Sequence, residues 1–472
     1  MVFTNGNPRH RARTTAECIL LQLSKVVERA VGSLVLPWLE STEAYGPHQY
    51  AYARGKSYKD VLAVNVCSWI LLMEQGLAVG LYCSDVKGAF DKVERDRLVA
   101  KLQRLGLHPD ALGFLCSWLE DRLSKVVLGG DSSALERLAN SVFQGTVLGP
   151  PLWNTFFADP RRPLNKRGFS DTTFADDLNA WKAFRLNRLA ANPHEAPLQE
   201  LREVQAELHL WGAANRVEFD PGKESFHILH RRLHYGENFK VLGCVFDSQL
   251  LMHAAARHVA TEAGWRLKVL LRSKRYFTTP ELVRLYKAQI LSFVESSSSA
   301  LYHAAASTLS RIDRVQDRFL REIGLSTLQA LKDYRLAPLR ARRDMAMLGL
   351  LHRVNLNTAP CQLASFFPKL GVRSEPLQRQ RLRHWRALHS KQLGTVATHF
   401  SSEVMKNSLF GLVHCYNQLP QRVADSLSVK ALQRSLQATL VTLADKGCED
   451  WSLLYAGVWR RFPRTHFDEL FK

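Results

Sequence analysis

The chain changes its pattern of apolar and polar residues near residue 248. Before that point, short apolar runs of strand length alternate with segments whose apolar residues recur at helical spacing. The run at 77–84 (LAVGLYCS) predicts a fully buried strand, and the segment before it predicts a helix that ends near Gly76. From residue 248 to the C-terminus the helical period dominates. We therefore expect an α+β part followed by an almost entirely helical part.

Within the first part, the pattern predicts two strands around a tight turn and then a hairpin that carries an acidic pair. The two strands are expected at 125–128 and 138–142. The hairpin is expected at 172–180, with Asp176 and Asp177 at its turn. Amphipathic or proline-initiated helices are expected at 96–105, 109–123, 151–159 and 198–214.

Charge and cysteine content narrow the class of protein. The 472 residues carry 64 Lys and Arg against 44 Asp and Glu, a formal net charge of +20. Such a surplus favours a polyanionic partner, although charge alone does not separate nucleic acid from an acidic membrane. The apolar stretch at 61–82 is interrupted by Glu74, so we interpret it as buried rather than membrane-spanning. The eight cysteines form no Cys-x-x-Cys pair, which favours a reducing intracellular compartment and no zinc site.

Three aspartates are candidates for a metal site. Asp85 ends the predicted buried strand, and Asp176 and Asp177 occupy the predicted hairpin turn, so one sheet can bring them together. Carboxylates at such short distances repel one another unless cations lie between them. Oxygen ligands of this kind suit Mg²⁺, with Mn²⁺ as the alternative.

Three motifs surround these acids in a fixed order. They are residues 83–93 (CSDVKGAFDKV), 143–154 (FQGTVLGPPLWN) and 174–177 (FADD). Together they resemble the palm motifs of reverse transcriptases from non-LTR retrotransposons, of the jockey-like and LINE type. The resemblance covers roughly residues 19–345.

The resemblance implies a right-hand polymerase with fingers, a palm with an antiparallel sheet, and a helical thumb, followed by a helical extension. On that basis we expect a basic flexible N-terminus at 1–18 and fingers and palm at 19–247. The thumb is expected at 248–330 and a helical basic C-terminal region at 331–472.

The resemblance also assigns roles around the metals. Asp85 and Asp176 are expected to bind two Mg²⁺ ions together with the carbonyl oxygen of Val86, and Asp177 to tune the site as the third catalytic acid. Phe90, five residues after Asp85, is expected to lie under the sugar of the incoming nucleotide. An aromatic ring there excludes a 2′-hydroxyl and selects deoxynucleotides.

Further positions follow from the same family. Gln144 and Gly145 are expected against the nascent base pair, and Lys223 is expected to donate a proton to the departing pyrophosphate. Leu242 and Gly243 resemble the turn of a primer-grip hairpin. The thumb is expected to follow a duplex backbone through Arg257, Arg266, Lys268, Arg272, Lys274, Arg275, Arg284 and Lys287.

The fingers depart from the family pattern. The family has an Arg-Pro-Ile-Ser run near its first finger helix, where this chain has Thr-Ala-Glu-Cys-Ile at 15–19. A further arginine expected after Tyr52 is Ala53. We therefore expect Lys56, with Arg54, to bind the nucleotide triphosphate in its place.

The resemblance implies an RNA-directed DNA polymerase that uses template RNA, a DNA primer and deoxynucleoside triphosphates. The alternatives are a decayed retroelement remnant that only binds nucleic acid and an RNA-dependent RNA polymerase. Too few residues precede residue 19 for the endonuclease that the family often carries there, so a separate endonuclease is one possible partner, and the sequence does not indicate what supplies the primer. The basic run at 373–391 is expected to bind template RNA. We expect no membrane partner, and an intracellular ribonucleoprotein in nucleus and cytoplasm; the sequence indicates no oligomeric state.

Overall fold

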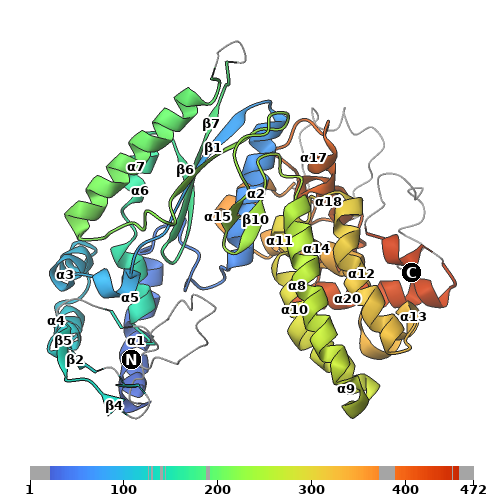
Figure 1. Ribbon diagram of the computed structural model, residues 1–472, viewed down its shortest axis with the longest axis horizontal. Helices are drawn as coiled ribbons and strands as arrows, with labels where there is room; N and C mark the ends of the chain where they lie inside the picture. The colour runs from blue at the N-terminus through green and yellow to red at the C-terminus, as the bar shows by residue number, and fades with distance from the viewer. Residues whose placement is uncertain are drawn as a thin grey trace. The chain divides into compact units, whose positions relative to one another are not determined.

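The computed structural model describes residues 22–125, 127–128, 131–138, 142–143, 145–187, 192–370, 389–448 and 450–455 (Figure 1). The chain divides into two compact units. The first contains residues 1–58 and 80–227, and the second contains residues 59–79 and 228–472.

The first unit is built on a sheet with helices packed around it. Its four strands are ordered β6-β7-β1-β8, with β1 at Ala78–Ser84, β6 at Ser170–Phe174, β7 at Asp177–Phe184 and β8 at Ser225–Leu229. Two small antiparallel pairs join β2 (Arg122–Ser124) to β5 (Glu136–Leu138) and β3 (Val127–Leu128) to β4 (Asp131–Ser132). The helices are α1 (Gln22–Ser41), α3 (Arg95–Arg104), α4 (Pro109–Leu119), α5 (Gly149–Phe156), α6 (Arg161–Lys166), α7 (Glu195–Asn215) and the 3₁₀ turn η1 (Ala89–Lys92).

The strand β1 is buried along its whole length, which explains its uninterrupted apolar sequence. Helix α7 lies along this sheet (Figure 1), and its Leu201 side chain packs over Gly80 of β1. A Cβ atom on Gly80 would lie 2.6 Å from the ring of Phe184, so glycine is required where this ring crosses the strand. The packing fixes the strand that ends at the candidate metal site.

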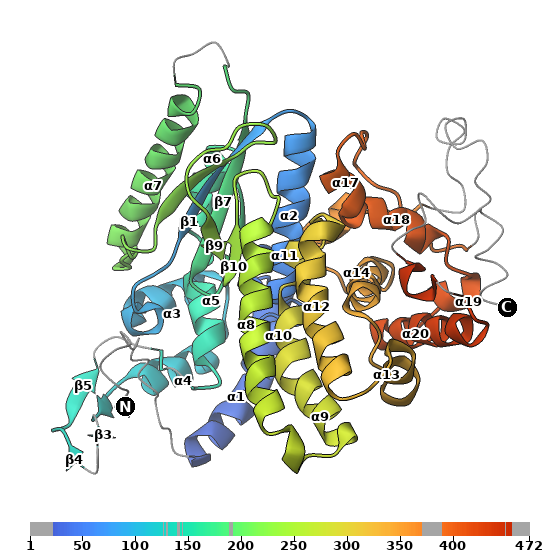
Figure 2. The ribbon, with the colours of Figure 1, turned by 45° about the vertical axis from the view of Figure 1, so that its right-hand side comes forward.

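Where its residues are described, the second unit is mostly helical and also contains a hairpin. The hairpin pairs β9 (Phe239–Val241) with β10 (Cys244–Phe246), and its two-residue turn is Leu242-Gly243. Up to residue 355, this unit's α-helices are α2 (Tyr58–Glu74), α8 (His253–Arg272), α9 (Thr279–Tyr286), α10 (Ser292–Ser296), α11 (Ser298–Leu301), α12 (Ala306–Glu322), α13 (Thr327–Tyr334) and α14 (Leu339–Asn355). The remaining helices are α15 (Cys361–Phe366), α17 (Glu403–Asn407), α18 (Leu409–Asn417), α19 (Gln421–Ala424) and α20 (Val429–Asp445), with a π-helix at Lys287–Leu291 and 3₁₀ turns at Lys274–Tyr276 and Trp451–Leu453. Helices α8 and α12 run side by side (Figure 2).

Helix α2 is buried within this second unit. Its Trp69 packs edge-on against Phe239 and Phe246 of the hairpin, with ring centroids 6.3 and 5.4 Å apart. The fully buried carboxylate of Asp60 forms an ion pair with Arg353 of α14. These contacts explain why a helix that precedes β1 in the sequence belongs with the C-terminal helices.

The predicted α+β class, with an antiparallel hairpin and a helical C-terminal region, is confirmed. The strands predicted at 125–128 and 138–142 are correct only in part: β3 lies within the first and β5 ends at residue 138, but these two strands do not pair with each other, and residues 139–141 lie outside the described residues. Residues 122–124 pair with 136–138, and residues 131–132, expected in the turn, pair with 127–128. Alternation over so few residues does not fix a register, whereas pairing partners do. The fourfold division of the chain stays a prediction.

Among the described residues, the structure contains no helix long and apolar enough to span a membrane.

Candidate active site

Asp85 is placed by a short backbone ladder beyond the end of β1. The N–H of Asp220 donates to the carbonyl of Asp85, and the N–H of Lys87 donates to the carbonyl of Glu218, both at 2.9 Å. Val86, at the centre of this ladder, pairs with Phe219 in an antiparallel bridge. Its carbonyl oxygen takes part in neither of the two bonds. The ladder holds the Asp85 side chain at the rim of the sheet, where 13% of it is exposed.

The second acidic element is the hairpin β6–β7. Phe174 pairs with Asp177, so Ala175 and Asp176 form a two-residue loop. Ala175 has a φ of 59°, in the left-handed region that costs a non-glycine residue about 1 kcal/mol or more. An arrangement of this kind persists only when its surroundings hold it.

The side-chain amide of Gln49 holds this loop. Gln49 is 3% exposed, and its Oε1 accepts from the N–H of Ala175 at 3.0 Å while its Nε2 donates to the carbonyl of the same residue at 3.1 Å. The indole N–H of Trp153 donates to that carbonyl as well, at 3.1 Å. Both backbone groups of Ala175 are thereby fixed, and the acids that follow it are aimed by this Gln49 clamp.

The charge of Asp85 acts on both acids of the hairpin. Burial and the charge of Asp85 raise the pKa of Asp177 to about 6, although Lys223 opposes the rise. Burial, the charge of Asp85 and the charge of Asp177 raise the pKa of Asp176 well above the usual range of an aspartate. Carboxylates that hold protons this tightly gain most from a cation placed between them.

Lys223 supplies one positive charge to this cluster. A turn closed by the N–H of Lys223 on the carbonyl of Asp220 (2.9 Å) carries the lysine towards Asp85. Its ammonium group pairs with the Asp85 carboxylate. The structure thus places Lys223 beside Asp85, and its role as a proton donor stays a prediction.

The donor set suits Mg²⁺ without forming a complete cage. No group of three or more His, Cys, Asp or Glu side chains within the described ranges is gathered closely enough to surround one ion. The charge of Asp85 acts on Asp176, and Val86, whose carbonyl oxygen is a further candidate ligand, directly follows Asp85 in the chain. Mg²⁺ commonly takes one or two carboxylates and completes its octahedron with water and substrate phosphates. Two protein carboxylates and a carbonyl therefore fit that requirement.

Phe90 lies close to the segment that carries the second motif. Its ring is 6.2 Å from that of Trp153, and its carbonyl accepts from the N–H of Val142 at 2.9 Å. A Cβ atom on Gly149 would lie 2.5 Å from Oγ1 of Thr146 and 3.7 Å from the Phe90 ring. Glycine at this position therefore avoids a clash with Thr146, whereas the space towards the Phe90 ring would accommodate a side-chain carbon.

Of the two loop residues expected against the nascent base pair, Gln144 and Gly145, the structure describes only the second. Gly145 is described, is exposed, and has a φ of 82° that favours glycine. Gln144 lies outside the described residues. Most of the basic run at 373–391 also lies outside them, because the description resumes at residue 389.

Lys56 is held by the backbone of its own loop. Its ammonium group donates to the carbonyls of Pro47 and Gln49 at 2.8 and 3.0 Å and lies 5.2 Å from the centre of the Tyr50 ring. Arg54 is exposed. Nucleotide binding by Lys56 stays a prediction, and the contacts with Pro47 and Gln49 give it a second role in fixing the loop that carries the Gln49 clamp.

In the second unit, the expected primer-grip turn is a sharp one. Leu242 and Gly243 both have positive φ, 48° and 78°, as the tightest two-residue hairpins require. Of the expected basic residues, Arg257, Lys268, Arg272, Lys274, Arg275 and Arg284 are exposed. Lys287 instead donates to the carbonyl of Tyr334, and Arg266 donates to the carbonyl of Gln289.

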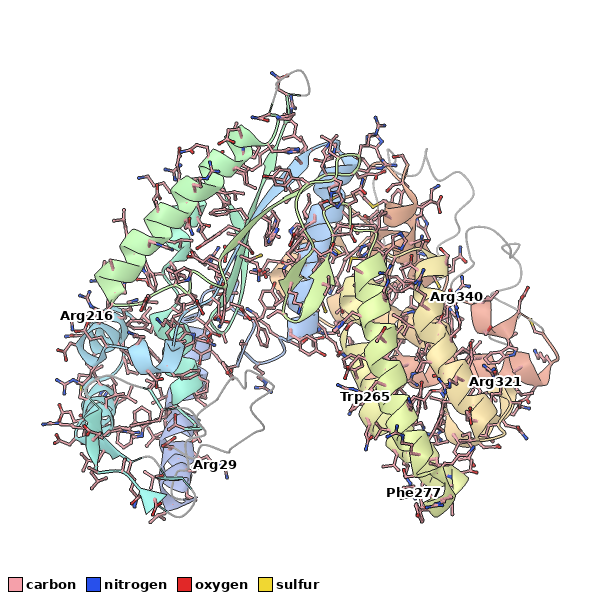
Figure 3. The ribbon with its side chains drawn as sticks, in the orientation of Figure 1. Arg29, Arg216, Trp265, Phe277, Arg321 and Arg340 are labelled. Atoms are coloured by element: carbon pink, nitrogen blue, oxygen red, sulfur yellow. The ribbon has the colours of Figure 1, made fainter. Side chains whose placement is uncertain are left out.

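Several residues with a role in the structure are not apparent from the sequence. The bonds of Gln49 and Trp153 to Ala175 join positions 126 and 22 residues apart. The aromatic side chains of Trp265 and Phe277, labelled in Figure 3, have exposed fractions of 63% and 40%. Within one sequence, no periodic signal marks such pairs or such exposure.

Comparisons with known proteins agree with the motifs. Residues 18–246 match the family described as reverse transcriptase (RNA-dependent DNA polymerase). The chain is 26% identical over 330 residues to the RNA-directed DNA polymerase from mobile element jockey of Drosophila melanogaster, covering 65% of this chain and 35% of that protein. It is 30% identical over 194 residues to the probable RNA-directed DNA polymerase from transposon BS of the same organism, covering 38% of this chain and 20% of that protein. The chain thus spans about a third or less of the length of these relatives.

Solved structures with a similar arrangement include telomerase from Candida tropicalis with a fragment of telomeric RNA, at a TM-score of 0.36 and 12% identity over 66% of this chain and 55% of that one. The sequence motifs, the two acidic elements that the first unit brings together and the matched family agree. The chain therefore contains, at residues 18–246, a reverse transcriptase domain related to those of jockey-like mobile elements.

Proposed function

We propose that this protein is an RNA-directed DNA polymerase that extends a primer 3′-hydroxyl with deoxynucleoside triphosphates on an RNA template. The observation that carries the proposal is the meeting of Asp85 with Asp176 and Asp177 at one edge of the sheet. The raised pKa values of Asp176 and Asp177 support a site built for cations rather than a solvated turn, because exposed aspartates would repel one another less.

Asp85, Asp176 and the Val86 carbonyl would hold two Mg²⁺ ions, with Mn²⁺ as the alternative. When bound, these ions would activate the attacking hydroxyl and neutralise charge on the departing pyrophosphate. Asp177 adds negative charge beside them, and Lys223 stands near Asp85 as a group that can supply a proton. The backbone ladder and the Gln49 clamp keep the acids in place, so little reorganisation is needed during the reaction.

Substrate choice rests on Phe90. Its ring stands near Trp153 and is approached by the second motif at Gly149. A ring supported in this way would clash with a 2′-hydroxyl, which supports deoxynucleotides over ribonucleotides as substrates.

The nucleic-acid partners we propose are template RNA and a DNA primer. The net charge of +20 and the exposed basic residues along α8 support phosphate contacts. The exposed rings of Trp265 and Phe277 offer surfaces for sugars or bases. Together with the family resemblance, this supports an intracellular ribonucleoprotein in nucleus and cytoplasm.

Primer extension on poly(rA)/oligo(dT) with Mg²⁺ tests the proposal. The intact chain should extend the primer, and Asp176→Ala should abolish extension. Asp131→Ala, an exposed aspartate in the same unit, serves as the matched control and should leave the rate unchanged. Extension that survives Asp176→Ala would refute the assigned site, and no extension by the intact chain would contradict the proposed activity.

A further inference from the structure

The second unit contains a cavity that the proposed polymerase reaction does not use. It has a volume of about 190 Å³ and lies between the start of α12, α14 and the α17–α18 segment. Its lining includes buried residues such as Ala304, Asp344 and Cys415 as well as exposed residues such as Lys406 and Asn407. A ligand can therefore reach it from solvent and place one end against buried groups.

The buried lining carries an acceptor without a partner. Asp344 is 5% exposed, and its Oδ1 accepts from the hydroxyl of Tyr302 at 2.8 Å. Its Oδ2 is buried and has no hydrogen-bond partner among the described residues. Buried polar atoms are nearly always satisfied in folded proteins, by protein, water or ligand. Asp344 therefore points to a hydrogen-bond donor that enters the cavity.

The charge of Asp344 is not cancelled by its nearest arginine neighbour in the sequence. Arg343 forms a bidentate pair with Asp313, at 2.7 and 2.9 Å. Burial raises the pKa of Asp344 to about 6, and Arg343 and Arg340 oppose that rise. At neutral pH the carboxyl is therefore mostly ionised and accepts hydrogen bonds.

The lining also carries positive charge. Arg340 lines the cavity and is half-buried. Lys406 also lines it, and its ammonium group is 3.0 Å from Glu403. These cations disfavour a cationic ligand such as a lysine side chain, and Asp344 disfavours a simple anion such as phosphate.

A ligand that suits both Asp344 and Arg340 must combine a hydrogen-bond donor with an anionic group a few bonds away. We propose that this cavity binds a nucleotide of RNA whose unstacked base donates to Asp344 Oδ2 and whose phosphate lies against Arg340. Nucleic-acid proteins commonly hold unstacked bases by their hydrogen-bonding edges. The volume suits one base rather than a longer ligand. The choice of a nucleotide rests on the proposed function, because that function makes RNA the partner of this chain.

Direct binding of mononucleotides to the full chain tests the site. We expect nucleoside 5′-monophosphates to raise the melting temperature in a saturable way and to give a binding isotherm by calorimetry. Inorganic phosphate alone should give neither. Comparison of the four bases then identifies which donor edge Asp344 prefers.

Two variants locate the binding. Asp344→Asn keeps the side-chain size and removes the charge, and Arg340→Gln removes the lining cation that lies one helical turn before Asp344 on α14. Each should weaken nucleotide binding at least tenfold. Asp344→Asn should leave the melting temperature of the free protein unchanged or higher, because an unpaired buried charge is lost. Asp333→Asn and Arg321→Gln, both exposed in the same unit, are the matched controls; Arg321 and Arg340 are labelled in Figure 3.

The result that overturns the proposal is nucleotide binding that neither Asp344→Asn nor Arg340→Gln weakens. The proposal is equally overturned if no nucleotide changes the melting temperature of the intact chain. Water is then the partner of Asp344. Primer extension is measured on the same preparations. Normal extension without nucleotide binding refutes this site alone, whereas binding without extension refutes the polymerase proposal and leaves the cavity assigned.

Discussion

Replacing Gln49 by alanine should damage catalysis through the geometry of the acidic loop rather than through any contact with substrate. The Gln49 side chain accepts from the N–H groups of Tyr50, Ala51 and Ala175, each at 3.0 Å, and donates to the carbonyl of Ala175. In the alanine variant the N–H of Tyr50 keeps its second hydrogen bond, to the carbonyl of Thr173 at 2.9 Å. The N–H groups of Ala51 and Ala175 lose the bond to Gln49.

The magnitude follows from those two donors. A buried donor left unsatisfied costs about 1–3 kcal/mol, so the native loop would be destabilised by about 2–6 kcal/mol if it did not move. Ala175 also recovers about 1 kcal/mol by leaving the left-handed region. The loop should therefore relax, and Asp176 should spend most of its time away from Asp85. Since about 1.4 kcal/mol corresponds to a tenfold change, we expect kcat to fall at least about tenfold.

Steady-state primer extension over a range of Mg²⁺ concentrations measures this effect. Gln49→Ala should lower kcat and raise the Mg²⁺ concentration needed for half-maximal rate, with little change in KM for the primer. Adding Ala175→Gly to Gln49→Ala should restore part of the rate, because glycine adopts a positive φ at little cost. Gln199→Ala, an exposed glutamine on α7, should behave like the intact chain.

Unchanged kcat and unchanged Mg²⁺ dependence in Gln49→Ala would refute the clamp. Loss of activity together with loss of helical circular dichroism would assign Gln49 to the general stability of the first unit instead. Failure of Ala175→Gly to restore any rate, in a variant that stays folded, would show that the left-handed φ is not what Gln49 maintains.

Three further results are expected. Phe90→Val should raise the kcat/KM for ribonucleotides relative to deoxynucleotides by tenfold or more, because the smaller side chain leaves room for a 2′-hydroxyl; equal use of both by the intact chain in primer extension would contradict the steric argument. The metal-free chain should lose stability as pH rises from about 4, the ordinary pKa of an aspartate, through about 6, because the folded state holds the Asp177 proton more tightly than the unfolded state. Mg²⁺ should raise the melting temperature more at pH 7.5 than at pH 5, and Asp177→Asn should reduce the pH dependence; a melting temperature that rises over this range in the intact chain would reverse the sign we assign. Arg353→Ala removes the ion-pair partner of the buried Asp60 and should destabilise the chain by about 3 kcal/mol in urea unfolding, whereas Arg434→Ala, exposed on α20, should cost little.

The sequence by itself determined the elements that carry the chemistry. A fully apolar run predicts a strand buried on both faces, and β1 does end one residue before Asp85. The acidic pair was expected at a hairpin turn, and the register places Asp176 in the loop and Asp177 opposite Phe174. Such predictions succeed because strand and helix periods follow from covalent geometry within a few neighbouring residues.

Tertiary structure decided what supports those elements. The Gln49 clamp joins residues 126 positions apart, and the pair between Asp60 and Arg353 joins residues 293 positions apart. Nothing in the local period of α2 indicates that it is buried with the C-terminal helices instead of with the strand it precedes. The cavity beside Asp344 is equally invisible in the sequence, since its lining comes from several helices. Which distant side chains meet is decided by how complete elements pack and by which buried polar groups find partners.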